Sequence, residues 1–511
     1  MKVVRSVRLW MKEGRSDKIY EVDLVDLERP DDARYLVNFR YGRRGTSLRD
    51  GTKTSSPVTR ANAEKLFDSV VVSKINDGYR RVDGDAPQPA VLDTAATANG
   101  RDTELLKKLA ICARGAWPDK ERDRLFWRLG VIRLTPAYPQ LAAIAEKVGA
   151  ANASYSLVYA LARCGGADAV DLLRGCADLN VSVVTRDYAA YALASELMGE
   201  RRPPPRLSLP RTTDIAATRD IEMALTNGDG AGLLQTLLAA SSAHPGFANQ
   251  FLIALAHHAL ADGAARKTLL AAVRAMTPRP PFVQVLRRLF KYADLTDDGP
   301  LFAATARQFE LATPMYRRGR VYNDHVWVPG SRQALKLSEE LRSASPRIAL
   351  SDQTLLYFKR RAWRMLRKRA ELGQDAFTAM ASELLLAFTD ADGIKPATWT
   401  EYVRIDGRFQ PAPHASEALS RVWSVSHLLH EMAGTSRFNP NALTHRHIGA
   451  REPAQREEAF PALWDAQPQR LLRIATLARN HAAARFAAEA LRQGPPRPET
   501  MDAAAIGGLL A

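Results

Sequence analysis

Cysteine is scarce in this sequence, and long apolar runs are absent from it. Its 511 residues include three cysteines, Cys112, Cys164 and Cys176, at apolar positions of helical stretches. That spacing fits neither a disulfide framework nor a zinc motif, and it favours a reducing compartment. No apolar run approaches the length of a membrane span, and no signal-peptide core follows Met1. We therefore expect a cytoplasmic protein, able to associate with the nucleoid, that has no membrane partner.

Acidic residues are fewer than basic ones. The chain has 56 Asp and Glu against 72 Lys and Arg, which gives a formal net charge of +16. Such an excess favours polyanionic partners, with nucleic acid first. The alternative is compositional, because the chain is generally rich in Ala and Arg. Its length predicts about two to four domains.

The first eighty residues have a β-type pattern. The runs 7–11, 19–25 and 35–41 are rich in Val, Ile, Tyr and Phe, and in the third run the odd-numbered residues share one face. A helix is predicted to begin after Thr59 and to end at Asp77-Gly78. Residues 1–83 are therefore expected to form a small antiparallel sheet with one helix laid across it.

The rest of the chain is mainly helical in pattern. Over residues 153–198, short apolar stripes at helical spacing alternate with tight turns, as in HEAT-like repeats. Val321–Val328 is expected to form a short strand or hairpin, and only helices are expected from residue 331 onward. The tail 501–511 is expected either to form a last helix or to mark a truncated chain. The predicted organisation is an 84–100 linker, 101–200 HEAT-like repeats, a 201–213 Pro-rich linker, and helical domains at 214–350 and 351–511.

Four separated landmarks in the N-terminal region carry a family resemblance. They are Glu13–Val22 (EGRSDKIYEV), Phe39–Thr46 (FRYGRRGT), Lys53, and Asp77-Gly78-Tyr79 after the helix. In this order and spacing they resemble the WGR domain, in the bacterial version found in molybdate-metabolism-regulator-like proteins. The same module lies beside the catalytic domain of poly(ADP-ribose) polymerases. The resemblance covers about a sixth of the chain.

The resemblance implies a role in binding DNA breaks. In that family the aromatic residue of the Trp-Gly-Arg triplet stacks on a terminal sugar or base, and the Arg contacts the 5′ phosphate or a neighbouring domain. Tyr41, Gly42 and Arg43 take these places here. Tyr41 departs from the family's Trp, which leaves a smaller π face for stacking.

The residues support a nucleic-acid site without the family. A Gly beside an aromatic ring lets backbone approach a ligand closely, and Arg binds phosphate with two parallel hydrogen bonds. In the alternative interpretation, Tyr41 completes the apolar face of the sheet and the cations are solvated. The predicted nucleic-acid-binding residues of this region are Tyr41, Gly42, Arg43, Arg44, Arg49, Lys53 and Tyr79.

A second basic candidate lies at residues 357–369 (YFKRRAWRMLRKR), on a helix expected to be capped by Ser351 or Asp352. A phosphate backbone would relieve the repulsion among its cations. A solvated helix paired with acidic neighbours such as Glu339 and Glu340 is an equal alternative. The cations expected outside the apolar stripe are Lys359, Arg360, Arg361, Arg364, Arg367 and Lys368, and we predict nucleic-acid contact for Lys359, Arg360, Arg364 and Arg367.

No catalytic constellation is recognised. Phosphate-binding glycine loops and Gly-x-Ser-x-Gly elbows are absent from the sequence, and nothing beyond the WGR-like region resembles an ADP-ribosyltransferase. One metal-like cluster of residues stands out, but it lacks the His-Glu-x-x-His order, and we interpret its histidines as core or capping residues. We assign no catalytic residue, metal or cofactor. The cluster is His427, His430, Glu431, His445 and His447.

Three hypotheses follow. The first is a non-catalytic nucleic-acid-binding protein, with DNA favoured over RNA, in which helical repeats form a scaffold. The second is an adaptor whose WGR-like domain and repeats bind partner proteins. The third is a HEAT-like enzyme that excises damaged bases. We favour the first.

Overall fold

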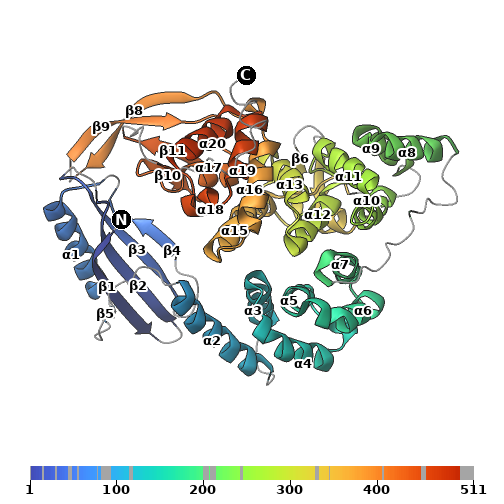
Figure 1. The fold of residues 1–511 in the computed structure, drawn as a ribbon, viewed down its shortest axis with the longest axis horizontal. Helices are drawn as coiled ribbons and strands as arrows, with labels where there is room; N and C mark the ends of the chain where they lie inside the picture. Colours follow the sequence, from blue (N-terminus) through green and yellow to red (C-terminus); the bar gives the residue numbers. More distant parts are fainter. Residues whose placement is uncertain are drawn as a thin grey trace.

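A computed structural model gives the fold of the chain (Figure 1). The residues that it describes are 2–13, 16–28, 32–43, 49–54, 57–77, 79–81, 94–113, 119–198, 207, 215–241, 246–328, 333–343, 346–405, 408–449 and 456–494. The predicted linker 201–213, apart from residue 207, and the tail 501–511 lie outside the described residues, as does Arg44.

The N-terminal region forms an antiparallel sheet, as predicted. Its strands lie in the order β4-β3-β2-β1-β5. The three predicted runs lie within β1, β2 and β3, whereas β4 and β5 were missed because strands this short carry too few residues for an alternating pattern. The bounds are β1 (Lys2–Glu13), β2 (Ser16–Asp26), β3 (Tyr35–Arg43), β4 (Arg49–Thr52) and β5 (Arg80–Arg81).

One helix, α1 (Arg60–Asn76), packs on one face of this sheet. Thr59 is its N-cap residue and Asp77 its C-cap residue, which confirms the predicted start and end. The odd-numbered residues of β3 point toward the helix, because side chains alternate along a strand. The fully buried side chains between helix and sheet are those of Leu9, Val22, Leu24, Val37, Ala63 and Phe67.

The opposite face of the sheet carries charges that neutralise one another. Glu21 on β2 is 6% exposed and lies between two arginines of the neighbouring strands. It accepts a hydrogen bond from Arg8 at 2.7 Å and pairs with Arg40 at 3.2 Å. Arg40 also reaches Asp23 at 3.3 Å. Basic and acidic side chains therefore alternate on this face, which does not form a continuous basic surface.

The body that follows is mostly helical, as predicted. Its first helix begins at Thr94, inside the stretch expected to be a linker. Within the described part of the chain, no helix combines the length and apolar character that crossing a bilayer requires. The helices up to residue 311 are α2 (Thr94–Ala113), α3 (Asp119–Ile132), α4 (Tyr138–Val148), α5 (Tyr155–Gly165), α6 (Val170–Leu179), α7 (Val183–Ala194), α8 (Ile215–Asn227), α9 (Gly230–Ser241), α10 (Phe247–His258), α11 (Gly263–Ala275), α12 (Val283–Thr296) and α13 (Gly299–Leu311).

Beyond residue 311 the chain mixes helices and strands. The short strand expected within 321–328 is present as β6 (His325–Val328). It pairs antiparallel with β7 (Gln333–Lys336), which lies beyond the expected bounds. The helices are α14 (Leu337–Arg342), α15 (Asp352–Glu371), α16 (Ala376–Ala387), α17 (Trp423–His430), α18 (Pro461–Asp465), α19 (Pro468–Leu477) and α20 (His481–Gln493).

The expectation of helices alone after residue 331 is wrong. Residues 397–448 include a four-stranded sheet in the order β10-β11-β9-β8. Pro411 and Pro413 in β9 concealed it, because proline is unusual inside a sheet. Among the described residues the register of β11 and β9 pairs His414 and Ala415, and Pro413 accepts a hydrogen bond from the Gly449 N–H, so neither proline has to donate one to β11. The strands are β8 (Ala397–Ile405), β9 (Arg408–Ser416), β10 (Ser436–Asn439) and β11 (Thr444–Ile448).

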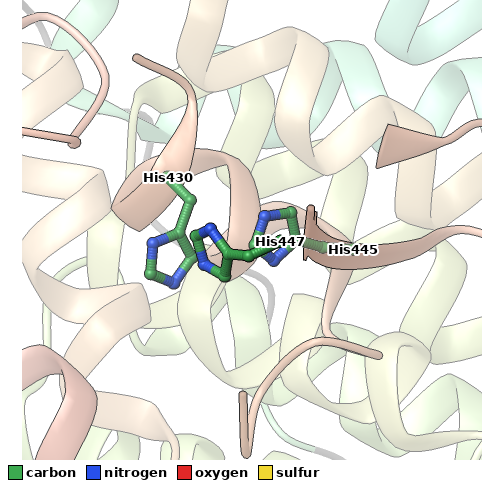
Figure 2. Close-up of side chains that lie close together, drawn as sticks. All are labelled: His430, His445 and His447. Atoms are coloured by element: carbon green, nitrogen blue, oxygen red, sulfur yellow. The ribbon is translucent and has the colours of Figure 1, made fainter. Parts of the chain in front are cut away.

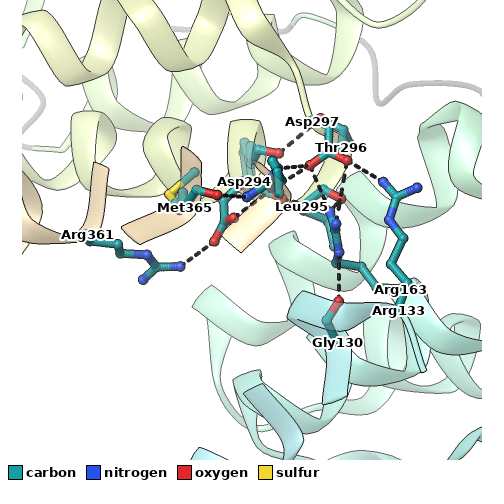
Figure 3. Close-up of polar contacts among 11 residues, drawn as sticks. Gly130, Arg133, Arg163, Asp294, Leu295, Thr296, Asp297, Arg361 and Met365 are labelled. Atoms are coloured by element: carbon teal, nitrogen blue, oxygen red, sulfur yellow. Dashed lines mark hydrogen bonds and ion pairs between the residues drawn. The ribbon is translucent and has the colours of Figure 1, made fainter. Parts of the chain in front are cut away.

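Arginines from several helices gather at the C-terminal end of α12 (Figure 3). Asp297 caps this helix in a left-handed conformation. Arg163 of α5 donates to the backbone oxygens of Asp294 and Leu295 at 3.0 and 2.8 Å, and to the Asp297 carboxylate at 3.1 Å. The last carbonyls of a helix lack intrahelical donors and carry partial negative charge, so guanidinium groups satisfy them well.

Helix α15 supplies two further arginines at the same place. Arg369 donates to Asp297 at 2.7 Å and to the Asp294 carboxylate at 3.1 Å. Arg361 donates to the other Asp294 oxygen at 2.7 Å and lies 4.2 Å from the Trp127 ring centroid on α3. These contacts join α3, α5, α12 and α15 into one structural unit.

Candidate nucleic-acid interface

A row of aromatic rings crosses the N-terminal sheet at the end of its helix-covered face. Tyr20 on β2 and Tyr41 on β3 are directly opposite in the ladder. The Tyr20 ring is stacked with Phe39 at a centroid distance of 5.5 Å and with Tyr41 at 6.0 Å. Tyr79, which follows α1, meets Tyr20 edge-on at 6.1 Å. The sheet thus places the predicted residues Tyr41 and Tyr79 against the same central ring.

The rings of this row differ in how far they are exposed to solvent. Tyr20 is 5% exposed, and burial, followed by the neighbouring Tyr41 and Tyr79, raises its pKa to about 12. Tyr41 is 39% exposed. Tyr41 therefore does continue the apolar face, as the alternative interpretation held, yet a large part of its ring remains open to solvent.

Two lysines lie over the aromatic row. The Lys53 ammonium is 5.0 Å from the Phe39 centroid, and that of Lys74 is 5.2 Å from the Tyr20 centroid. Lys74 pairs with Asp77 at 2.6 Å, whereas no carboxylate among the described residues pairs with the exposed Lys53. Gly51 on β4 is needed here, because a Cβ at this position would lie 2.6 Å from the Phe39 ring.

The backbone positions of the other predicted residues are defined by β3. Gly42 lies opposite Ile19 and Arg43 opposite Lys18, while Arg49 on β4 is paired with Tyr41. Strand pairing therefore brings Tyr41, Gly42, Arg43 and Arg49 to one end of the sheet. The nucleic-acid role of these residues stays a prediction.

Several cations of the basic helix α15 make contacts with other parts of the protein. The prediction that Arg361 lies outside the apolar stripe is wrong, since this residue is 5% exposed and binds Asp294. Lys359 donates to the backbone oxygen of Glu310 at 2.6 Å. Burial lowers the pKa of Lys359, and the opposing effect of the Glu310 carboxylate is smaller. Arg360 donates to the backbone oxygen of Pro440 at 2.5 Å.

The remaining cations of α15 are closer to solvent. Arg364 is exposed, and its Nε donates to the backbone oxygen of Arg360 at 3.3 Å. Arg367 pairs with Glu371 at 3.0 Å, and Lys368 contacts the same carboxylate. The acidic partners of the helix are thus Asp294, Asp297, Glu310 and Glu371, where the sequence suggested Glu339 and Glu340.

Three of the histidines that were interpreted as core residues come together in space. His430 ends α17, and His445 and His447 lie on β11 (Figure 2). All three are buried, and one nitrogen from each lies within 4.8 Å of the others. The sequence had grouped these three histidines with His427 and Glu431 in one metal-like cluster, but the separation of α17 and β11 along the chain gave no sign that the three rings would meet.

No protein-family model matches this chain, and no curated protein or solved structure shows significant similarity to it.

Proposed function

We propose that the chain is a non-catalytic nucleic-acid-binding protein of the cytoplasm whose WGR-like N-terminal domain contacts DNA in preference to RNA. The helical body serves as a repeat-type scaffold. The observation that carries the proposal is the partly exposed ring of Tyr41, which is stacked with the rings of Tyr20 and Phe39. Lys53 lies nearby, over the Phe39 ring.

The chemistry of this arrangement suits an exposed base or a strand end. An aromatic ring that already packs against two other rings is restricted in its rotation, so it loses little conformational freedom when a base stacks on it. A lysine beside the ring supplies a point charge for phosphate. The opposite face of the sheet is less suited, because Glu21 and Asp23 already neutralise Arg8 and Arg40.

The test is binding to a 5′-phosphorylated nicked duplex and to the same duplex intact. We expect a preference for the nick that Tyr41→Ala weakens by about 5- to 150-fold, which corresponds to one lost base–aromatic stack. Tyr41→Phe keeps the ring and should bind like the wild type. Lys53→Ala should weaken binding and reduce the salt dependence by about one counterion.

Two matched variants control for general effects. Tyr402→Ala removes a ring that is 71% exposed on β8, and Lys147→Ala removes an exposed lysine on α4. Neither should alter nick binding. Equal affinity of wild type and Tyr41→Ala for the nick, with both proteins folded, would refute the proposal.

A second candidate, the protein-interaction adaptor, is favoured by one observation in the helical body. The corner between α6 and α7 exposes four apolar side chains, Leu179 at 67%, Val181 at 74%, Val183 at 52% and Val184 at 37%. Contiguous exposed apolar residues are typical of protein contacts. A protein complex that persists in high salt and is lost in Val181→Ser/Val183→Ser would support this function, while salt-sensitive DNA binding unaffected by that change would not.

A further inference from the structure

The fold brings three imidazoles from two elements to one point. His445 and His447 are separated by one residue of β11, so both side chains project from the same face of the strand. His430 meets them from the end of α17, with ring centroids 4.8 Å from His445 and 4.9 Å from His447 (Figure 2). Their exposed fractions are 5%, 3% and 1% for His430, His445 and His447.

Each ring is oriented by a hydrogen bond on one nitrogen. His430 Nδ1 lies 3.1 Å from the Glu457 carboxylate. His447 Nδ1 lies 3.0 Å from the Thr435 hydroxyl. Histidines that bind a metal typically donate their second N–H to a carboxylate, carbonyl or hydroxyl, which fixes the tautomer and directs the other nitrogen to the ion.

The third ring follows the same rule. His445 Nε2 lies 2.9 Å from the Ser436 hydroxyl on β10. In the tautomer in which His430 donates its Nδ1–H to Glu457, the lone pair of the ring lies on Nε2. The nitrogens that would bind a shared cation are then Nε2 of His430, Nδ1 of His445 and Nε2 of His447.

Two nearby histidines show what a core histidine looks like in this region. His427 lies parallel between the rings of Trp363 and Phe438, at centroid distances of 4.8 and 3.9 Å, and its Nδ1 contacts Glu431. His414 on β9 packs against Trp399 at 5.5 Å. Neither belongs to the group of three, in which each ring instead meets two other imidazoles.

We infer that His430, His445 and His447 bind one divalent transition-metal ion of the zinc class, which fastens β11 to the end of α17. Neutral imidazoles suit zinc, cobalt, nickel and copper, and they disfavour magnesium and calcium. A tetrahedral zinc ion at about 2.0–2.1 Å from each nitrogen would hold the three nitrogens about 3.4 Å apart. One nitrogen from each ring now lies within 4.8 Å of the others, so metal binding would require the rings to move closer together.

The surroundings supply charge and access. Glu457 places a carboxylate beside His430, which offsets part of the ion's charge. His430 and Glu457 also line a pocket together with Glu458, Glu489, Arg456 and Arg485. This pocket reaches His430 and Glu457, whereas His445 and His447 do not line it. In a site with three protein ligands, water would complete the coordination of the ion.

The first experiment is metal analysis of the full chain, purified without a polyhistidine tag from zinc-supplemented medium. We expect about one zinc per chain, and a chelator should remove it and lower Tm. Co²⁺ added to the metal-free protein should produce the visible absorption bands of tetrahedral cobalt. This spectrum tests the wild type directly and does not depend on the stability of any variant.

Variants locate the site. His447→Gln should lose the zinc, whereas His414→Gln, a change at an equally buried histidine of the same sheet, should retain it. Glu457→Gln keeps all three ligands and should weaken zinc affinity by about 10- to 100-fold. The inference is overturned if the wild type holds no stoichiometric metal and gives no tetrahedral cobalt bands, or if folded His447→Gln binds zinc as the wild type does.

Discussion

Arg361 on α15 and Asp294 on α12 form an ion pair at 2.7 Å in which both side chains are almost completely buried. The guanidinium also donates to the Tyr357 hydroxyl at 2.8 Å and lies over the Trp127 ring. A buried charge that loses its partner retains its desolvation cost. The pair therefore aligns the two helices, and the protein depends strongly on both of its members.

The first prediction concerns removal of this pair. Arg361→Ala should lower the free energy of unfolding by about 3–5 kcal/mol, because Asp294 is left with a buried charge only partly matched by Arg369. Urea-induced unfolding measures the change. Arg174→Ala breaks an exposed pair with Asp171 on α6 and should cost less than about 1 kcal/mol. Equal effects of the two variants would contradict the role of burial.

The second prediction concerns acid stability. Burial alone would raise the pKa of Asp297, but Arg369, Arg163 and Arg133 lower it to about 2. Because the pKa is depressed in the folded state, the native protein binds fewer protons than the unfolded chain between about pH 4 and pH 2. Stability is present above that window and is lost as the pH falls through it.

Asp297→Asn tests this directly. At pH 7 the variant should lose the contribution of the carboxylate, which is about 2–3 kcal/mol from the pKa difference. Below pH 4 its stability should fall less steeply than that of the wild type. Asp171→Asn, at an exposed carboxyl on α6, should leave the acid profile unchanged. Parallel acid profiles for wild type and Asp297→Asn would show that the arginines do not hold this pKa down.

The third prediction concerns a neutral buried histidine. Burial, with a smaller effect of His258, lowers the pKa of His257 to about 4, and its ring meets Tyr191 edge-on at 5.3 Å. The unfolded chain binds a proton at pH values where the native ring does not. Stability should therefore decline as the pH falls from about 6.5 to 4, by about 3 kcal/mol in total.

His257→Phe keeps an aromatic ring in the same place and removes the titration. Thermal unfolding between pH 7 and pH 4 should show a smaller loss of stability for this variant than for the wild type. His481→Gln, at an exposed histidine of α20, should keep the wild-type slope. An unchanged slope in His257→Phe would mean that other groups dominate this range.

Local signals explain what could be predicted from the sequence. The parity of Tyr35, Val37, Phe39 and Tyr41 places one face of β3 on the core, and Thr59 marks the start of α1, because both features depend on neighbouring residues. The cation-rich pattern of α15 revealed a helix but not its partners. Asp294 lies 67 residues from Arg361 along the chain, so only the packing of α12 against α15 shows that the charges match.

The histidine cluster illustrates the same limit. Residues 445 and 447 face the same way only if they lie on a strand, and the sequence around them indicated helices. Pro411 and Pro413 concealed β9, the strand beside β11. The residues were visible in the sequence, whereas their convergence with His430 depends on a sheet that tertiary packing stabilises and local propensity does not predict.

The location of the arginines at the end of α12 divides the protein's positive charge into two populations. Exposed cations such as Lys53 act through water and are screened within about 8 Å at physiological ionic strength. Arg163, Arg361 and Arg369 are sheltered from mobile ions by burial. A rise in ionic strength should therefore weaken the contacts of the outer cations without loosening the alignment of the helices.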